Sequence, residues 1–461
     1  MPRTVRRITV GTVMLGTIAA GTLPATAVQA MPTTPATDRE ITFTVDGTTT
    51  YGTLHIPAHR RGQKMPAVLL LPGSGPTDRN GDQPPALTPH TLAKLAGALA
   101  HDGVVSLRFD KYGTGRTGLG AYAGRPETLD HPAFVRQAAT AYRLLAGQPE
   151  VNRRAVRLIG HSEGALTALR VAVAAEPRTA GVGLLQPLAK RFLDVLAQQL
   201  HDQLAAAVAA GQMSRQEQLT LGRAVDRAVA DFRAHRPPDT SAMPPALADL
   251  FRALDGPSRR YVETIDAIDP VAVAYQLPRR TPVLLTCGTI DPQVPCHMTT
   301  PLAVALEQAH TRGPGRIVLS GVAHDLTDPA NPDVLAPATL DALGRFMRYG
   351  ARTCIAPRNH QGVPVGRNVR RAISPAATAA AAQTLNRTGQ AIALSAGGGS
   401  NTICSAPPAG TTRTASVPTG PERWVNAPTA PSTGPKHTPA ISQYWVALPH
   451  QTSPSKITST Q

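Results

Sequence analysis

The strongest constraint on the fold is an alternation between residues 41 and 187. Short runs of β-branched and aliphatic residues are separated by longer stretches that carry apolar residues every three or four positions. The first pattern is typical of buried strands, and the second is typical of helices that pack one face on a core. The expected strands are Ile41–Val45, Thr50–Ile56, Ala67–Leu71, Val104–Phe109, Val156–Ile159 and Val182–Leu185, and the expected helices are Thr91–His101, Pro132–Ala146 and Glu163–Ala174. The alternation predicts an α/β protein, in which a mostly parallel sheet is covered by helices on both faces and opens with an antiparallel pair of strands.

Strand signals stop after Pro187 and return only near residue 282. Residues 188–265 are rich in Ala, Leu, Gln and Arg, and two Pro-Pro pairs, at 237–238 and 244–245, break this stretch into shorter helices. Two further strands are expected at Pro282–Thr286 and Arg316–Leu319, followed by a closing helix at Leu335–Tyr349. We therefore expect residues 31–187 and 266–350 to form one α/β core and residues 188–265 to form an inserted helical cap.

The first thirty residues have the pattern of a secretory signal peptide. Arg3, Arg6 and Arg7 precede an uncharged run from Ile8 to Ala20, and Ala27-Val28-Gln29-Ala30 resembles a cleavage site. Cleavage after Ala30 would leave a secreted or extracytoplasmic protein with no stable membrane insertion. An uncleaved anchor is the alternative, but glycines interrupt a run that is too short for a good membrane span.

Most of the positive charge lies at the C-terminal end of the chain. The formal net charge is +16, and residues 351–461 hold ten Lys and Arg residues against Glu422 as the one acid. Because residues 31–350 are nearly balanced, we expect no nucleic-acid partner. The basic tail could be weakly attracted to anionic envelope polymers or could simply be solvated. Its Ala, Pro, Thr, Ser and Gly composition predicts a low-complexity, mostly disordered segment.

Four cysteines in a secreted chain permit two disulfides, for which three pairings exist. Cys287 and Cys296 flank a short loop, whereas Cys354 and Cys404 lie beyond the expected core, so we prefer the pairs 287–296 and 354–404. The alternative for Cys287 is a small buried residue at the end of a strand. Because the sequence has no Cys-x-x-Cys motif or clustered Cys and His spacing, we expect no structural metal.

One strand runs into a sharp Gly-x-Ser-x-Gly turn. Val156–Ile159 is followed by Gly160-His161-Ser162-Glu163-Gly164 and then by an alanine-rich helix. A nucleophile elbow needs this context, because its strained turn leaves no room for side chains two residues before and after the serine. Ser162 is therefore the expected nucleophile, and the alternative is a serine that caps an ordinary helix.

A serine hydroxyl needs a base to take its proton and a carboxylate to orient that base. Asp291 lies in the loop after the strand at 282–286, and His324 lies in the loop after the next strand, so both follow Ser162 in the order serine, acid, histidine. We expect them to complete a catalytic triad. Rivals are Asp266 and Asp269, which precede a strand, His297, which lies further from a strand end, and Asp325 and Asp328, which follow the histidine.

Two backbone N–H groups are needed to meet the oxyanion of the tetrahedral intermediate. One is expected from Glu163, directly after the nucleophile. The other is expected from the glycine-rich loop after the strand at 67–71, with Ser74 as our choice and Gly75 second. The alternative for this loop is an ordinary Gly-Pro turn.

Three stretches of the sequence resemble the α/β-hydrolase superfamily, and more closely its secreted serine-aminopeptidase-like esterase branch. They are Leu70–Gly81, Arg108–Gly115 and Gly160–Gly164, in this order along the chain. The resemblance covers about residues 40 to 350 and implies an α/β-hydrolase fold that hydrolyses carboxyl esters through an acyl-enzyme, without a cofactor. Asp78, Arg79, Asp110 and Lys111 lie in loops that match the family, and we expect them to form loop-fixing ion pairs first and substrate contacts second.

The expected activity is therefore a secreted serine hydrolase acting on small esters with short to medium acyl groups. A serine aminopeptidase or a thioesterase would use the same chemistry. An aminopeptidase needs acids to hold the substrate ammonium, and the cap has such acids without obvious clustering: Asp194, Asp202, Glu217, Asp226 and Asp231. A catalytically idle envelope-binding protein on the same fold is the alternative from another class.

Overall fold

The computed structural model describes residues 33–349, and the expected signal peptide and C-terminal tail lie outside them, as do Cys354 and Cys404. Within that range an eight-stranded sheet has the order β10-β9-β8-β7-β5-β6-β3-β2. Its strands are β2 (Thr37–Val45), β3 (Thr48–Ile56), β5 (Met65–Leu71), β6 (Val105–Phe109), β7 (Val151–His161), β8 (Val182–Leu185), β9 (Pro282–Gly288) and β10 (Arg312–Leu319). All neighbouring strands from β6 to β10 pair in parallel, whereas β2–β3 and β3–β6 are antiparallel. The predicted α/β class and the opening antiparallel pair are confirmed.

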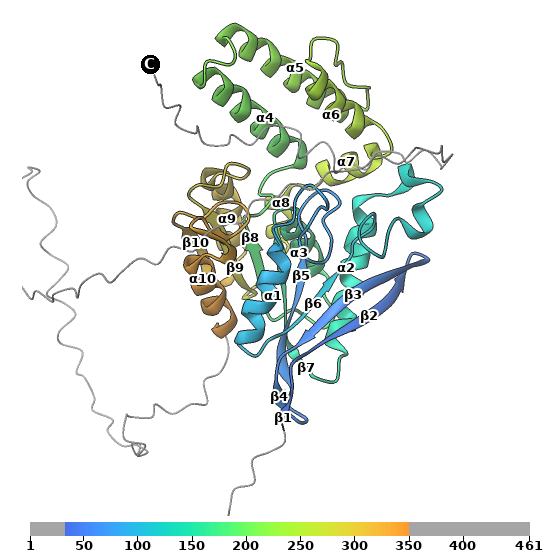
Figure 1. The fold of residues 1–461 in the computed structure, drawn as a ribbon, viewed down its shortest axis with the longest axis vertical. Coiled ribbons are helices and arrows are strands. Elements are labelled where there is room, and N and C mark those ends of the chain that lie inside the picture. The colour runs from blue at the N-terminus through green and yellow to red at the C-terminus, as the bar shows by residue number, and fades with distance from the viewer. Residues whose placement is uncertain (1–32, 350–461) are drawn as a thin grey trace, which may run out of the picture. The chain divides into compact units, whose positions relative to one another are not determined.

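Helices cover both faces of this sheet (Figure 1). On one face α1 (Thr91–His101) and α10 (Pro337–Arg348) pack against alternate residues of the central strands, such as Val68 and Leu70. On the other face lie α2 (His131–Ala146), α3 (Glu163–Val173), α8 (Pro270–Ala274) and α9 (Thr300–Gln308), which pack against residues such as Leu69 and Leu71. Both faces of the central strands β5, β8 and β9 are therefore buried, which explains why these strands are mostly apolar rather than alternating, whereas the edge strand β10 is largely exposed.

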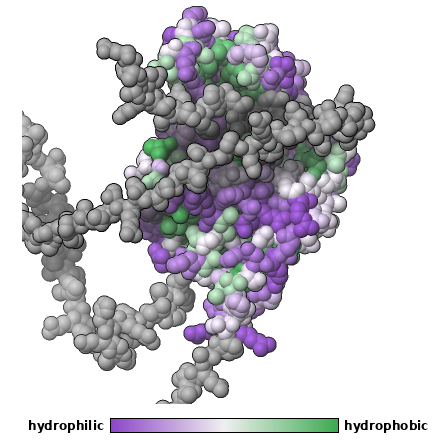
Figure 2. Space-filling view, viewed as in Figure 1, coloured by the Kyte–Doolittle hydropathy of each residue, from purple (hydrophilic) through white to green (hydrophobic). Residues whose placement is uncertain are grey.

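The cap consists of α4 (Phe192–Ala209), α5 (Arg215–Arg233), α6 (Pro245–Asp255) and α7 (Arg259–Asp266), drawn at the top of Figure 1. Their apolar residues form a separate cluster that also includes Leu166 of α3 and Val294 and Met298 of the core, so the cap is packed onto the sheet domain. Figure 2 shows apolar residues between hydrophilic ones on the drawn face of the cap. No helix in residues 33–349 combines the length and the apolar character that crossing a membrane requires.

Several elements differ from the expected ones. The strand β7 starts at Val151, five residues earlier than expected, and pairs there with Met65 of β5. Two helices, α8 and α9, were not predicted, nor were the short pairs β1 (Thr33–Thr34) with β4 (His59–Arg60) and β11 (Thr327–Asp328) with β12 (Asn331–Leu335). These elements are short, and a segment of two to nine residues carries little periodic signal.

Asp266 has a structural role at the junction of cap and core. Its buried carboxylate accepts hydrogen bonds from Arg191, from Arg233 and from the backbone N–H of Leu193. Because all of these partners belong to the cap or to its entry, the carboxylate ties the end of α7 to the start of α4. Asp266 thus holds the ends of the cap helices α4, α5 and α7 together.

Candidate active site

Ser162 sits between β7 and α3 with φ of 54° and ψ of −121°. A positive φ is strained for a residue with a side chain, and it persists only where the surroundings fix the backbone. Here the N–H of Ser162 donates to Leu185 O, while its carbonyl accepts from the N–H groups of Ala165 and Leu188. The sharp turn is therefore held from both sides.

The glycines around Ser162 are required by close backbone packing. A Cβ at Gly160 would lie 2.0 Å from the carbonyl oxygen of Gly164, and a Cβ at Gly164 would lie 2.3 Å from that of Leu71. Neither position can hold a side chain without moving the main chain. The pattern of glycines two residues before and after the serine thus has the steric cause expected of a nucleophile elbow.

The structure brings the other two expected triad residues into contact. Nδ1 of His324, in the loop after β10, lies 2.9 Å from Oδ2 of Asp291, in the loop after β9. The other oxygen of Asp291 accepts from the backbone N–H groups of Gln293 and Val294 at 2.8 and 2.9 Å. Burial alone would raise the pKa of Asp291, but the charge and hydrogen bond of His324 and these two N–H groups outweigh it and hold the pKa below its ordinary value. Asp291 is therefore an ionised acceptor, so His324 carries its proton on Nδ1 and presents Nε2 as a base.

His161, the residue before Ser162, contacts His324 directly. The rings of His161 and His324 lie 4.8 Å apart, and Nε2 of His161 is 2.7 Å from the carbonyl oxygen of His324. Within the described residues the hydroxyl of Ser162 and the ring of His324 are not hydrogen bonded. Such a contact often closes only when substrate is bound.

His161 is a further residue of the candidate site and is not among those expected from the sequence. Burial, followed by the nearby His324, lowers its pKa to about 4, so the ring is neutral at pH 7 and donates its Nε2 proton to the His324 carbonyl. Gln186 fixes the same loop, because its Nε2 donates to the carbonyl of Ala323 at 3.0 Å. The position of His161 inside the Gly-x-Ser-x-Gly turn was the available signal, whereas nothing local marked Gln186.

The two expected oxyanion donors are free. Among the described residues, the backbone N–H groups of Ser74 and Glu163 donate to no protein acceptor. Gly73 lies directly beside the nucleophile, since a Cβ placed on it would be 3.2 Å from that of Ser162. Ser74 thus follows a residue that lies against Ser162, Glu163 follows Ser162 itself, and neither N–H group is used by a protein acceptor.

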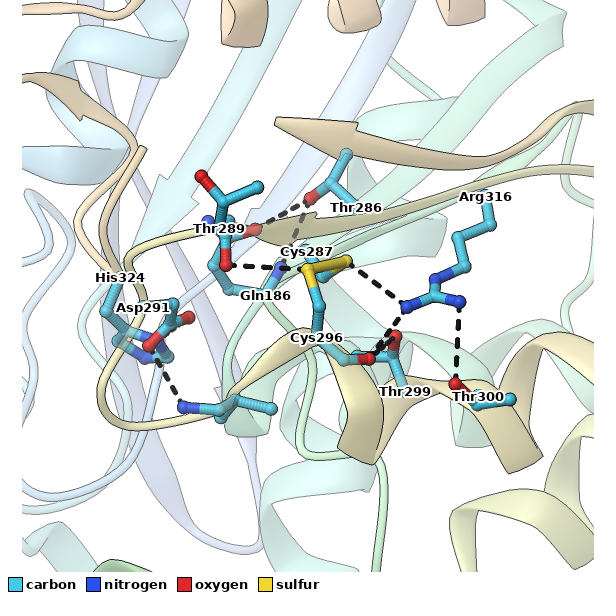
Figure 3. Close-up of a disulfide and its surroundings, with 12 residues drawn as sticks. Gln186, Thr286, Cys287, Thr289, Asp291, Cys296, Thr299, Thr300, Arg316 and His324 are labelled. Atoms are coloured by element: carbon cyan, nitrogen blue, oxygen red, sulfur yellow. Dashed lines mark hydrogen bonds and ion pairs between the residues drawn. A yellow bond between two sulfur atoms is a disulfide. The ribbon is translucent and has the colours of Figure 1, made fainter. Parts of the chain in front are cut away.

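A disulfide joins Cys287 at the end of β9 to Cys296 and encloses the loop that carries Asp291 (Figure 3). The preferred 287–296 pairing is therefore confirmed. Arg316 of β10 donates to the carbonyl of Cys296 at 2.7 Å and so ties the far end of this loop to the next strand (Figure 3). The disulfide and Arg316 together restrict the loop that carries Asp291, whose carboxylate orients His324.

The loop residues expected to form ion pairs do so only in part. Arg79 and Asp110 make a bidentate pair, with Nε and Nη2 of Arg79 at 3.0 and 2.7 Å from the carboxylate. Asp78 instead accepts the backbone N–H groups of Asn80 and Asp82 and closes its own turn. Lys111 is paired with no carboxylate among the described residues and donates to a backbone carbonyl. The prediction that Lys111 forms an ion pair is therefore wrong.

A sheet of this order, with a serine at a strand-to-helix elbow and an Asp–His pair after the two following strands, defines an α/β-hydrolase architecture. The sequence matches the alpha/beta hydrolase family model over residues 68–338, more than half of the chain. The chain therefore belongs to the alpha/beta hydrolase family.

Solved structures with a similar fold include esterases and a peptidase. An esterase, Pf2001, from Pyrococcus furiosus shares 16% identity over 68% of this chain and 90% of its own, with a TM-score of 0.44. The alpha/beta hydrolase GrgF from Penicillium sp. sh18 shares 19% over 68% and 98%, with a TM-score of 0.42. A proline iminopeptidase from Mycobacterium smegmatis shares 15% over 67% and 98%, with a TM-score of 0.43. No curated protein matches the chain.

In residues 33–349 no group of three or more His, Cys, Asp or Glu side chains is placed to hold a metal ion. A cavity of about 530 Å³ lies between α4 and α5 and is lined by Ala197, Val229, Ala230 and Ala234 together with Asp194, Asp226 and Arg233. No triad residue lines this cavity, and we assign it no part in the chemistry.

Proposed function

We propose that this protein is a secreted serine hydrolase that cleaves carboxyl esters with short to medium acyl groups through an acyl-enzyme. Ser162 is the nucleophile, His324 the general base and Asp291 the residue that orients the base. The observation that carries the proposal is the buried Asp291–His324 hydrogen bond beside a serine held at positive φ. Nucleophilic acyl transfer needs a serine on a strained turn together with an imidazole that is held in one orientation.

In this mechanism the Ser162 oxygen attacks the ester carbonyl carbon while Nε2 of His324 takes the hydroxyl proton. The carbonyl oxygen becomes an oxyanion that accepts hydrogen bonds from the N–H groups of Ser74 and Glu163. Collapse breaks the bond to the alcohol, which leaves with the proton from His324. A water molecule, activated by His324, then attacks the acyl-enzyme and releases the carboxylic acid and the free serine.

The acids of the cap support an ester substrate over an aminoacyl one. The five cap acids considered from the sequence as partners of a substrate ammonium are all bonded within the cap: Asp194 to Arg233, Asp202 to Gln198, Glu217 to Ser214, Asp226 to His201 and Asp231 to Arg236. An ammonium would have to displace one of these partners. An uncharged acyl chain meets no such competition.

One observation favours an aminopeptidase as the second candidate. Glu163, next to the nucleophile, is buried, and its Oε1 accepts from the hydroxyl of Tyr261 at 2.6 Å, whereas its Oε2 has no partner among the described residues. This buried, unpartnered carboxylate oxygen belongs to the residue after the nucleophile and is the group that would hold the α-ammonium of a peptide. Glu163→Gln would then abolish cleavage of aminoacyl anilides and spare that of esters.

Labelling with a fluorophosphonate probe tests the nucleophile. We expect the wild-type protein to be labelled and Ser162→Ala to remain unlabelled, with Ser320→Ala as the matched control that stays labelled. A folded wild-type protein that is not labelled would refute the proposal of a serine hydrolase and favour a catalytically idle envelope-binding protein.

A substrate series separates the remaining activities. We expect p-nitrophenyl esters of short to medium chain length to be cleaved with higher kcat/KM than acyl thioesters or aminoacyl anilides. Faster cleavage of anilides would establish the aminopeptidase, and faster cleavage of thioesters the thioesterase.

Secretion is part of the proposal and has its own test. Expression of the full chain with its first thirty residues should yield extracytoplasmic protein whose N-terminal residue is Met31. Retention of the arginine-containing segment in the mature protein would instead indicate a membrane anchor. Attraction of the basic tail to anionic envelope polymers would be detected as salt-dependent binding that a variant ending at Gly350 lacks.

A further inference from the structure

Lys111 is a buried cation whose position needs an explanation. It is the second residue after β6 and is 6% exposed. Its Nζ donates to the carbonyl oxygen of Gly73 at 2.6 Å and lies 5.9 Å from the ring centre of Phe134. Burial lowers the pKa of Lys111, which the charge of Glu163 partly opposes. Burying an ammonium group without a hydrogen-bonded carboxylate costs free energy. The hydrogen bond from Lys111 to the Gly73 carbonyl is therefore the contact whose function has to be explained.

The carbonyl that Lys111 holds belongs to the same peptide unit as the N–H of Ser74. A trans peptide is planar, so its C=O and N–H point in opposite directions. A bond that fixes the Gly73 carbonyl therefore also fixes the direction of the Ser74 N–H. On the other side of Ser74, its own carbonyl accepts from Thr77 Oγ1 and Gln83 Nε2 at 2.6 and 3.0 Å, so the following peptide is anchored as well.

The other expected oxyanion donor is fixed in an equivalent way. The N–H of Glu163 shares its peptide with the carbonyl of Ser162, which accepts from the backbone N–H groups of Ala165 and Leu188 at 3.0 Å each. That donor is thus aimed by main-chain bonds. The donor of Ser74, in contrast, depends on a side chain 38 residues away.

We infer that Lys111 is a positioning residue for ester hydrolysis, which aims the Ser74 N–H at the oxyanion by holding the Gly73 carbonyl. A charge-assisted bond at the carbonyl also polarises the peptide and makes its N–H a stronger donor. Lys111 touches neither the substrate nor the reacting atoms. The inference rests on the proposed function, because it assigns a role within that oxyanion hole.

Lys111→Met tests the inference, because methionine keeps most of the apolar stem and removes the donor. We expect kcat for a p-nitrophenyl ester to fall about 10- to 100-fold, which does not exceed the decrease in kcat that removal of one oxyanion donor causes. KM should stay within about 3-fold of the wild-type value. Inhibition by an alkyl boronic acid, whose serine adduct carries a tetrahedral oxyanion, should weaken by a similar factor. A merely structural role would not lower kcat and boronate affinity together while sparing KM.

Thr114→Val is the matched control. Its hydroxyl donates to the carbonyl of Lys111 at 2.9 Å, so the variant removes a buried hydrogen bond from the same loop without touching Gly73. We expect it to lose thermal stability and keep kcat. If Lys111→Met does not fold, Lys111→Gln serves in its place, since its amide is one atom shorter and leaves the carbonyl unheld.

A folded variant that lacks Lys111 but keeps the wild-type kcat and boronate affinity would overturn the inference. In that case ester hydrolysis and fluorophosphonate labelling of the wild type would still stand. If the wild type itself hydrolyses no ester and is not labelled, the proposed function fails, and the role assigned to Lys111 fails with it.

Discussion

The carboxylate of Asp291 is fully occupied by the loop that carries it and by His324. One oxygen accepts two backbone N–H groups, of Gln293 and Val294, and the other lies 2.9 Å from Nδ1 of His324. The side chain of Asp291 is completely buried and that of His324 is 11% exposed. The orientation of the imidazole is therefore decided by one carboxylate that has no freedom to turn.

This arrangement predicts the effect of Asp291→Asn. The amide oxygen must take the two backbone N–H groups, so its NH2 group must face Nδ1 of His324. The histidine then accepts at Nδ1 and carries its proton on Nε2, where it cannot serve as a base. We expect kcat for ester hydrolysis to fall about 10⁴-fold with the fold intact, as the same change does in serine proteases.

Asp325→Asn is the control for that experiment. Asp325 follows His324 in the chain and accepts from the hydroxyl of Thr327 instead. We expect its kcat to stay within a few-fold of wild type. Equal losses in the two variants would contradict the assignment of Asp291.

The disulfide predicts a redox-dependent stability. Cys287 and Cys296 are nine positions apart, and cross-linking a loop of this length stabilises the folded state by about 2–3 kcal/mol in the chain-entropy view. Dithiothreitol should therefore lower the melting temperature of the wild-type protein, followed by circular dichroism. The double variant Cys287→Ala/Cys296→Ala should melt at the lower temperature with or without reductant. A large further decrease with reductant would point to a second disulfide, such as the expected 354–404 pair.

His131 predicts a loss of stability in mild acid. The residue is fully buried, neither ring nitrogen has a partner among the described residues, and burial lowers its pKa to about 4. Between that value and its ordinary pKa near 6.5 the unfolded chain binds a proton that the folded protein does not, so the free energy of unfolding falls as pH decreases through this range. The slope per histidine is at most about 1.4 kcal/mol per pH unit.

Replacing His131 by leucine should remove this contribution. We expect His131→Leu to gain stability over wild type in urea unfolding at pH 5, and to gain less at pH 7.5. His101→Gln, which changes a histidine whose side chain is 92% exposed, should leave the pH dependence unchanged. An unaltered slope in His131→Leu would show that this histidine is not the group that titrates.

Two glycines predict opposite effects of the same substitution. In Gly164→Ala the new Cβ would lie 2.3 Å from Leu71 O and 2.6 Å from Pro72 O, and these backbone atoms could move away only at a large cost in free energy. We expect little folded protein, or a loss of several kcal/mol with loss of fluorophosphonate labelling. Gly97→Ala, within α1 and with open space around its Cβ, should instead raise stability by about 0.5–1 kcal/mol. Thermal melts of both variants provide the comparison, and an unperturbed Gly164→Ala would argue against the packing at the elbow.

The amino-acid sequence alone predicted the fold class, most of the strands and long helices of the core, and the family. It did so because these features have local signatures: apolar runs at strand spacing, helical periodicity, and a strand, turn and helix around Gly160-His161-Ser162-Glu163-Gly164. Asp291 and His324 could be selected as candidates because each follows a strand, and parallel strands end at one edge of a sheet. The Cys287–Cys296 pair could be preferred because its two members flank one short loop.

Which atom each side chain reaches became apparent only from the packed fold. Lys111 was expected in an ion pair and instead holds the Gly73 carbonyl, Glu163 meets Tyr261 across 98 positions, and His161 and Gln186 fix the His324 loop from β7 and from the end of β8. No local pattern encodes such contacts, because they form between segments that become neighbours only when the sheet is assembled and the cap is packed onto it. Residue type and spacing give the elements and the candidates, whereas the partners of buried polar groups follow from packing.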